Sequence, residues 1–403
     1  MTGPLEGIRV VELGVWVAGP GAAGILADWG ADVVKVEPPS GDPARQFHLM
    51  LGGAPDDVNA VFELDNRGKR AVVLDLGSDR GREVLERLLG TADVLVTNIR
   101  PAALERLGLG PERVLEDHPR LVYGIITGFG LEGPDAARAA YDIAAFWARA
   151  GIAESLRTPG GQLPFQRGGM GDHSVAMTAA GMISAALVGR ASTGRGRLVT
   201  TSLLRQGAYT IGFDVNVALM WGRTINIGVR EKMHSPTVNN YVAGDGRAFW
   251  LVGLEGPRHW PALARAVGRP EWIDDERFAD PRGRAINGEA LIAELDAIFA
   301  SRPLEEWAAV FEEEPELFWS PVNTIEDLLV DPQFWASGAV VQVEDETGSW
   351  AELATPADFD GSPPVPRAPA PRLGQHTRAV LAELDYDAAT IEELLAGGAA
   401  TEG

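Results

Sequence analysis

One aspartate at the start of a predicted helix is the residue best suited to covalent chemistry. Asp172 follows a turn in which Gly168, Gly169 and Gly171 are three of the five preceding residues, and a mostly small or apolar run follows it. The residues alone leave two interpretations open. Aspartate is a favoured N-cap. A helix N-terminus also favours an ionised carboxylate, and such a group beside backbone N–H donors could attack an acyl group.

Residue types and spacing argue against most other catalytic chemistries. The sequence contains no cysteine, so it has no thiol nucleophile, and none of its 6 histidines is paired with another at metal-ligand spacing. We therefore expect no metal site. It contains neither a G-x-S-x-G elbow nor a phosphate-binding P-loop. His173 adjoins Asp172, but successive side chains on a helix point in different directions.

Polar residues follow a predicted strand in the first half of the chain. Asn98, Arg100 and Arg106 come after DVLVTNI, and ligands of open α/β sheets bind at the carboxyl ends of strands. Arginines there suit a phosphate group, although a solvated helix face explains them equally well. The run GPGAAG at 19–24 is a weak dinucleotide signal, because close packing of a helix on a sheet also requires glycine.

The elements that carry these residues alternate between strand and helix. Apolar β-branched runs at 8–13, 31–37, 69–76, 93–99 and 120–130 are separated by helical segments, which predicts a Rossmann-like open parallel sheet of the α/β class. We predict three regions: a large domain over 1–215, a smaller α+β domain over 216–330, and a C-terminal segment over 331–403 that returns to the large domain. The small domain should contain a hairpin around Asp245-Gly246.

The amino-acid composition limits the kinds of partner that we expect this protein to bind. The net charge of −22 should repel nucleic acid and anionic membranes. The N-terminus shows no signal peptide, and no window approaches the length of a membrane span. With no cysteine present, a cytoplasmic location is expected.

Several segments, in matching order over nearly the whole chain, resemble the family III CoA-transferases, which include formyl-CoA and carnitine CoA-transferases. The α-methylacyl-CoA racemases share this fold. The segments are LEGIRVVELGVWVAGPGAAGILADWGADVVKVEPPSGDPAR, NRGKRAVVLDL, VTNIRPAALERLGL, AAYDIAAF, GMGDHSVAM, TGRGRLV and LGQHTRAVLAEL.

The resemblance implies an architecture and a reaction. Each subunit would be an open ring of a large and a small domain, and two rings would interlock in a homodimer. Asp172 falls on the family's catalytic aspartate, which exchanges CoA between an acyl-CoA and a carboxylic acid acceptor through an aspartyl anhydride and an aspartyl-CoA thioester. No tightly bound cofactor is implied, because CoA enters as substrate. The implied CoA-binding residues are Leu74, Asn98, Ile99, Arg100 and Arg106.

A second position distinguishes the transferases from the racemases. Racemases carry a histidine before an aspartate, whereas this sequence reads Ala140-Tyr141-Asp142. Tyrosine is what the CoA-transferases carry there, and a phenol, with a reference pKa of about 10, is a poor base for an α-proton. The resemblance therefore favours a transferase, with Tyr141 in its active site. A racemase, or a non-catalytic CoA-thioester-binding paralogue, is the alternative.

The sequence departs from the formyl-CoA transferase pattern near its substrate pocket. Val17 replaces the active-site glutamine, Trp16 precedes it, and Pro38 replaces a CoA-contacting arginine. A small dianion needs polar partners, so Trp16 and Val17 predict a larger or more apolar acyl group. With Pro38 in place of that arginine, Arg45, Arg70 or Arg106 would take the CoA phosphates.

Overall fold

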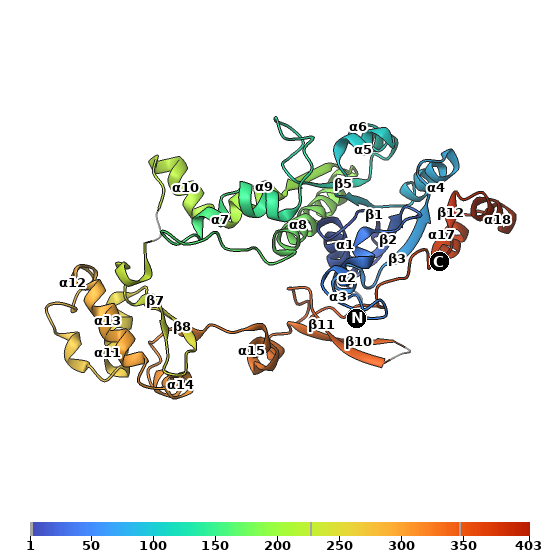
Figure 1. Cartoon of the computed structure of the whole chain (residues 1–403). Coiled ribbons are helices and arrows are strands. Elements are labelled where there is room, and N and C mark those ends of the chain that lie inside the picture. The colour runs from blue at the N-terminus through green and yellow to red at the C-terminus, as the bar shows by residue number, and fades with distance from the viewer. Residues whose placement is uncertain (1–2, 226–227, 346–347) are drawn as a thin grey trace. The chain divides into compact units, whose positions relative to one another are not determined.

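The computed structural model describes residues 3–225, 228–345 and 348–403. The chain divides into two compact units, which are drawn in Figure 1. The large unit combines Met1–Glu154, Pro164–Thr224 and Gln333–Gly403, and the small unit combines Ser155–Leu163 and Ile225–Pro332.

A seven-stranded sheet forms the centre of the large unit, in the order β12-β3-β2-β1-β4-β5-β6. All neighbours pair in parallel except β12, which runs antiparallel to β3. The predicted open parallel sheet is therefore confirmed. Its strands are β1 (Arg9–Leu13), β2 (Asp32–Glu37), β3 (Arg70–Leu74), β4 (Val94–Thr97), β5 (Val122–Thr127), β6 (Leu198–Ser202) and β12 (Ala400–Thr401).

The strand order reverses beside β1, which has β2 on one side and β4 on the other. Val10 pairs with Val33 of β2 and with Val94 of β4, so the buried strands are held in register from both sides. In open α/β sheets such a reversal leaves a crevice at the carboxyl ends of the strands, where ligands bind. The loops after β1 and β4 therefore occupy the favoured ligand position of this sheet.

Helices cover both faces of this sheet. One apolar core contains residues of α1 and α8, and the other contains residues of α4, α5, α6, α17 and α18. In Figure 1 the C-terminal helices and β12, drawn in red, lie beside β3. The helical segments within the large unit are α1 (Ala18–Asp28), η1 (Pro43–Gln46), α2 (Phe47–Met50), α3 (Ala60–Asn66), α4 (Asp79–Leu89), α5 (Pro101–Arg106), α6 (Pro111–Asp117), η2 (Ile143–Arg149), α8 (Met170–Thr193), α9 (Leu203–Thr210), α10 (Gly212–Trp221), α17 (Thr377–Glu383) and α18 (Ala388–Ala396).

The longest helix, α8, is long and apolar enough to cross a membrane by length and composition, alone among the described helices, so the prediction that no window approaches the length of a membrane span is wrong. Its residues Val175, Ala176, Ala179 and Ile183 are fully buried in the core that it shares with α1. The apolar composition of α8 is therefore that of a core helix packed against a sheet.

The small unit is built around a short antiparallel sheet, in the order β7-β8-β9. The predicted hairpin is confirmed, because β7 pairs with β8 across the turn that contains Gly246, whose φ is 83°. An aromatic core fills the unit, including Trp260, Phe299 and Phe311. Its elements are η3 (Arg230–Lys232), β7 (Val238–Val242), β8 (Ala248–Val252), α11 (Gly256–Ala266), η4 (Pro270–Ile273), α12 (Pro281–Ile286), α13 (Gly288–Phe299), α14 (Leu304–Glu312), β9 (Trp319–Pro321) and α15 (Ile325–Val330).

The chain passes between the two units near two short helices, α7 (Ile152–Ser155) and α16 (Pro332–Ala336). After α16, the antiparallel hairpin of β10 (Val340–Asp345) and β11 (Gly348–Leu353) belongs to the large unit.

Candidate active site

The loop that leaves β1 is fixed from two directions. The Asn98 side chain accepts a hydrogen bond from the Val15 backbone N–H at 3.0 Å and donates one to the Val15 carbonyl at 2.7 Å. The Trp16 backbone N–H donates to Asp42 Oδ1 at 3.0 Å. Trp16 has a φ of 64°, which is uncommon for a bulky residue and needs such support. Asn98 therefore positions the β1–α1 loop through its side chain.

A buried ionic network lies under this loop, and sequence reasoning missed it. The Lys35 ammonium donates to Glu12 Oε1 at 2.8 Å and to Asp42 Oδ2 at 2.9 Å, and the Lys69 ammonium donates to Glu12 Oε2 at 2.7 Å. All four side chains are fully buried. The signal was present in the sequence, since Lys35 and Lys69 are two of only three lysines in the chain.

The network also binds the loop backbone. Lys35 donates to the Gly14 carbonyl at 3.3 Å, and Lys69 donates to the Pro20 carbonyl at 2.8 Å. Burial lowers the pKa of Lys69 to about 8, whereas the surrounding carboxylates overcome the same burial at Lys35 and raise its pKa. The loop is thus held at both ends by groups that cannot reach solvent.

Aromatic rings gather at the outer side of the loop. The Trp16 ring meets the rings of Phe47 and Tyr141 edge-on, each with its centroid 6.0 Å away. Tyr141 is exposed, at 65%, and both Trp16 and Val17 are half-buried. The structure therefore brings together three residues predicted for the site, Trp16, Val17 and Tyr141, around a partly open apolar surface.

Asp172 is the third residue of α8, and the N-cap is Gly169, with a left-handed φ of 75°. The N-cap interpretation of Asp172 is therefore wrong, because the glycine conformation starts the helix three residues earlier. The Asp172 side chain is half-buried. Within the described part of the chain, no group donates a hydrogen bond to its carboxylate, so this acid has no evident structural partner.

A second carboxylate braces the turn before Asp172. Asp142 accepts hydrogen bonds from the Ile143 backbone N–H at 2.7 Å, from Gln166 Nε2 at 3.0 Å and from the Gly171 backbone N–H at 3.4 Å. A Cβ at Gly171 would lie 2.5 Å from the Phe146 ring, so glycine permits this close approach. Asp142 thereby ties the Tyr141 segment to the start of α8.

Burial, followed by the charge of Asp142, raises the pKa of Asp172 to about 7. This outcome is opposite to the expectation from the helix N-terminus, which favours the ionised form. Partial removal from water and a nearby like charge outweigh the helix effect. Asp142 and Asp65 both come close enough to Asp172 to disfavour its charge, although they are distant from it in sequence.

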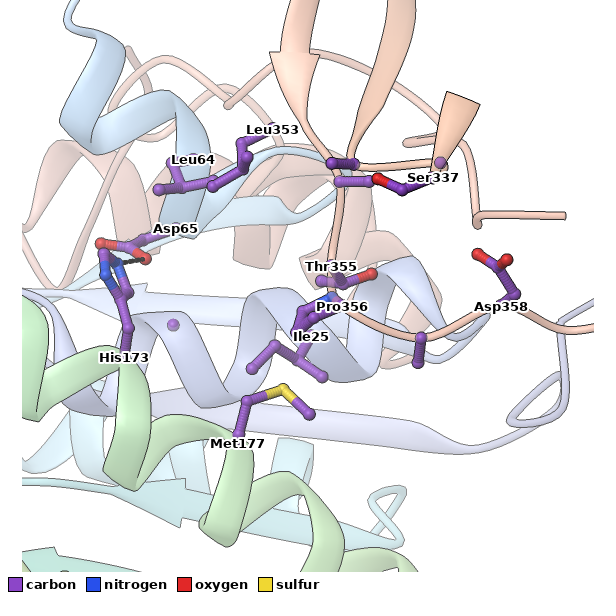
Figure 2. A pocket seen from close by; sticks show the side chains of 15 residues that line it. Ile25, Leu64, Asp65, His173, Met177, Ser337, Leu353, Thr355, Pro356 and Asp358 are labelled. Carbon is purple, nitrogen blue, oxygen red and sulfur yellow. Dashed lines mark hydrogen bonds and ion pairs between the residues drawn. The ribbon is translucent and has the colours of Figure 1, made fainter. Parts of the chain in front are cut away.

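The Nε2 of His173 lies 3.1 Å from Oδ1 of the buried Asp65 on α3 (Figure 2). The hydrogen bond to Asp65 raises the pKa of His173 above its ordinary value. The Asp65–His173 pair was not recognised from the sequence, because its members are 108 residues apart.

The residues implied for CoA binding lie in different environments. Leu74 is fully buried, and Ile99 is half-buried after β4. Arg100 and Arg106 are exposed at the two ends of α5, and neither forms an ion pair with any residue that the structure describes. By contrast, Arg45 binds Glu37 at 2.6 Å, and Arg70 binds Asp32 at 2.6 Å and Glu383 at 2.7 Å.

Arg106 also lines a surface hollow with Arg82 and Arg113. Arg82 and Arg113 each pair with a carboxylate, Asp79 and Asp117 respectively. Among the described residues of this hollow, Arg106 is the cation left available for an anionic group. The described residues contain no cluster of three or more side chains that could hold a metal ion.

Comparison with known proteins identifies the family. The family model for CoA-transferase family III matches residues 5–377. The chain is 33% identical over 389 residues to (R)-2-hydroxy-4-methylpentanoate CoA-transferase of Clostridioides difficile, covering 95% of this chain and 96% of that protein. It is 31% identical over 401 residues to cinnamoyl-CoA:phenyllactate CoA-transferase of Clostridium sporogenes, covering 98% and 96% respectively.

A solved structure is similar over the same length. The crystal structure of a CAIB/BAIF family protein from Brucella suis superposes with a TM-score of 0.82 at 30% identity, covering 96% of this chain and 100% of that one.

Proposed function

The chain belongs to CoA-transferase family III, and from this premise we propose that it is an acyl-CoA:carboxylate CoA-transferase whose nucleophile is Asp172. One observation carries the assignment. Asp172 is half-buried at the start of α8 with no hydrogen-bond donor among the described residues, and its pKa is raised to about 7. The neighbouring Asp142 is fully paired with donors, whereas the Asp172 carboxylate has none in the described part of the chain. Asp172 is therefore available for chemistry.

The first half of the reaction removes the donor acid. The ionised Asp172 carboxylate attacks the thioester carbonyl, the carbon–sulfur bond breaks, and CoA thiolate leaves an acyl-aspartyl anhydride. The thiolate then attacks the aspartyl carbonyl. The donor leaves as a carboxylate, and an aspartyl-CoA thioester remains on Asp172.

The second half reverses these steps with the acceptor. The acceptor carboxylate attacks the aspartyl thioester and expels the thiolate, which gives a new mixed anhydride. The thiolate attacks the acceptor's carbonyl, so acceptor acyl-CoA is released and Asp172 returns as a carboxylate. Every step exchanges one activated acyl group for another, so no ATP is required.

We place CoA along the carboxyl ends of β1 and β4. The strand order reverses there, and Asn98 and Ile99 follow β4. Arg100 and Arg106 support this placement as exposed arginines without ion pairs among the described residues, since a phosphate attracts a free guanidinium. Leu74, at the end of β3, is fully buried, which argues against a direct contact between this residue and CoA.

We infer an apolar acid as substrate. The Trp16 ring forms T-shaped contacts with the rings of Phe47 and Tyr141 beside the loop, and Val17 stands where formyl-CoA transferases carry a glutamine. Aromatic and aliphatic walls favour hydrocarbon and leave a small dianion without polar partners. The related proteins named for 2-hydroxy-4-methylpentanoate and phenyllactate support a branched or aromatic acid.

We propose a homodimer, interlocked as the resemblance implies. The helix α10 supports an interface, because none of its residues is buried and its surface is apolar. Phe213 is 90% exposed and Trp221 is 61% exposed, and such a patch normally marks a contact. Interlocked subunits should give no folded monomer on dilution, which light scattering over a concentration series measures. A cytoplasmic location stays a prediction.

The central test is the nucleophile. Asp172→Ala should abolish CoA exchange between acyl-CoA and free carboxylates while CoA binding is retained. Hydroxylamine added during turnover should inactivate the unsubstituted enzyme and leave a hydroxamate on the Asp172 peptide, detected by mass spectrometry. Glu112→Ala, which removes an exposed first-turn acid from α6, is the matched control. Near-normal turnover by Asp172→Ala would refute covalent catalysis.

A further inference from the structure

A cavity of about 600 Å³ lies in the large unit beside the start of α8. It is lined by residues of α1, α3 and α8 and by residues 337–339 and 353–358 of the C-terminal segment. Figure 2 shows the residues that line it, with the Asp65–His173 pair beside α3 and Met177 further along α8. The volume falls within the range of about 300–1,000 Å³ that is usual for small-molecule sites.

The lining of the cavity is mostly hydrocarbon. Ile25 comes from α1, Leu64 from α3, Met177 from α8, and Leu353 and Pro356 from the C-terminal segment. The charged residues of the lining are Asp65, His173 and Asp358. Asp65 and His173 are hydrogen-bonded to each other at 3.1 Å, and Asp358 disfavours an anion. The chemistry of the walls therefore suits an uncharged apolar group.

The cavity lies close to the proposed nucleophile. His173, which lines it, is the residue directly after Asp172, and Asp65 and His173 both act electrostatically on the Asp172 carboxyl. Gly21 also lines the cavity, and a Cβ there would lie 3.1 Å from Asp65 Oδ1 and 3.3 Å from the Ala176 Cβ. Asp172 itself is not among the residues that line the cavity, so an acyl group bonded to it would reach the cavity past Asp65 and His173.

We propose that this cavity receives the hydrocarbon part of the transferred acyl group, beyond its carbonyl carbon. The inference rests on the proposed function and extends it to a substrate class, the acyl groups with a medium-length or branched apolar tail. The Asp65–His173 pair marks the end of the cavity near the carbonyl, and the apolar walls accept the tail. Transfer of the tail from water into this cavity should improve the affinity for the acyl-CoA by about fourfold for each buried methylene.

The test fills the cavity and varies the tail. Met177→Trp places a larger side chain in the cavity from α8, and Ala354→Leu narrows it from the opposite segment. Val188→Trp makes the same kind of change at a position of α8 that is 75% exposed. The measurement is kcat/KM for straight-chain acyl-CoAs, from acetyl to decanoyl, with one fixed acceptor.

The expected pattern is selective. Both cavity variants should lose tenfold or more in kcat/KM for the longest tails and keep their activity with acetyl-CoA, and Val188→Trp should change neither. A uniform loss across all tails, or no change at any length, would overturn the proposal. If one cavity variant fails to fold, the other still tests the proposal, because Met177 and Ala354 line the cavity from different segments.

A binding measurement separates this inference from the transferase assignment. Calorimetry with S-alkyl-CoA thioethers of increasing length requires no turnover. Affinity that rises with length in the unsubstituted protein, and does not rise in Met177→Trp, supports the cavity even if no CoA transfer is found. Affinity that is independent of tail length in the unsubstituted protein refutes it, and leaves the cavity to solvent or to a segment of a second subunit.

Discussion

Replacing Asp142 by asparagine should move the acid limb of the pH–rate profile to lower pH. In the proposed mechanism Asp172 attacks a thioester only as a carboxylate, and its pKa of about 7 means that catalysis should rise with pH through neutrality. Burial is the main cause of the raised pKa, and the charge of Asp142 is the second. Asp142→Asn removes the second cause and leaves burial in place, so Asp172 should ionise at lower pH.

The size of the shift follows from Coulomb's law. Two like charges about 4 Å apart interact by roughly 4 kcal/mol at an effective dielectric constant of about 20, and the repulsion falls as their separation grows. A shift of one pKa unit corresponds to about 1.4 kcal/mol. Because Asp172 is only half-buried, solvent screens part of this repulsion, so we expect the limb to move by about one pH unit.

The assay is kcat/KM for one acyl-CoA between about pH 5 and pH 9. Asparagine retains an oxygen that can accept from Gln166 or from the Gly171 N–H, which favours retention of the local geometry. Asp135→Asn is the control, since it removes a carboxylate of the same segment that is paired with Arg149 at 3.0 Å. An active, folded Asp142→Asn enzyme whose limb stays in place, or moves upward, would refute this electrostatic account.

Three further changes test separate parts of the site. Arg106→Ala should weaken the binding of CoA much more than that of dephospho-CoA in calorimetry, because Arg106 is a cation unpaired among the described residues and suited to the 3′-phosphate. Equal weakening of both ligands would show that Arg106 does not bind this phosphate. Asp172→Asn should raise the free energy of unfolding by about 1–3 kcal/mol at pH 8, as measured in urea titrations. Because the pKa of Asp172 is raised in the folded protein, its ionisation lowers the stability of the unsubstituted protein as pH rises from about 4 to about 7. This gain should disappear near pH 4, and a gain that is the same at both pH values contradicts the argument. Asp42→Asn should cost about 3 kcal/mol of unfolding free energy by leaving Lys35 with one less buried carboxylate, whereas Asp57→Asn, at an exposed turn acid that binds the Ala54 N–H, should have little effect.

The sheet could be predicted because its strands are short, apolar and β-branched. The predicted runs at 8–13, 31–37 and 93–99 contain β1, β2 and β4 almost entirely. The antiparallel strand β12 was missed, since it has only two residues, Ala400 and Thr401, and no pattern of its own. Its conformation depends on pairing with Leu74 and Val73 at the edge of the sheet. Such a strand exists through tertiary contact, which local sequence does not encode.

The electrostatics of the site depend on contacts that are distant in sequence. Asp142 reaches the Gly171 N–H from 29 positions away, and His173 reaches Asp65 from 108 positions away. Sequence reasoning therefore identified Asp172 as a candidate while giving the wrong direction for its pKa. The left-handed conformation of Trp16 was equally hidden, because non-glycine residues rarely adopt it and the support comes from Asp42.

The contrast between Asp172 and its surroundings carries the functional argument. Buried polar groups in folded proteins are almost always hydrogen-bonded, because an unpaired one costs free energy. Glu12, Lys35, Asp42 and Lys69 obey this rule with fully paired side chains, and they fix the loop that carries Trp16. Asp142 obeys it too, with three donors. Asp172, half-buried, lacks any such donor among the described residues. The neighbouring acids are paired with donors, whereas Asp172 has none within the described ranges and its pKa is raised. This contrast supports the proposal that Asp172 is a nucleophile, which must be free to attack.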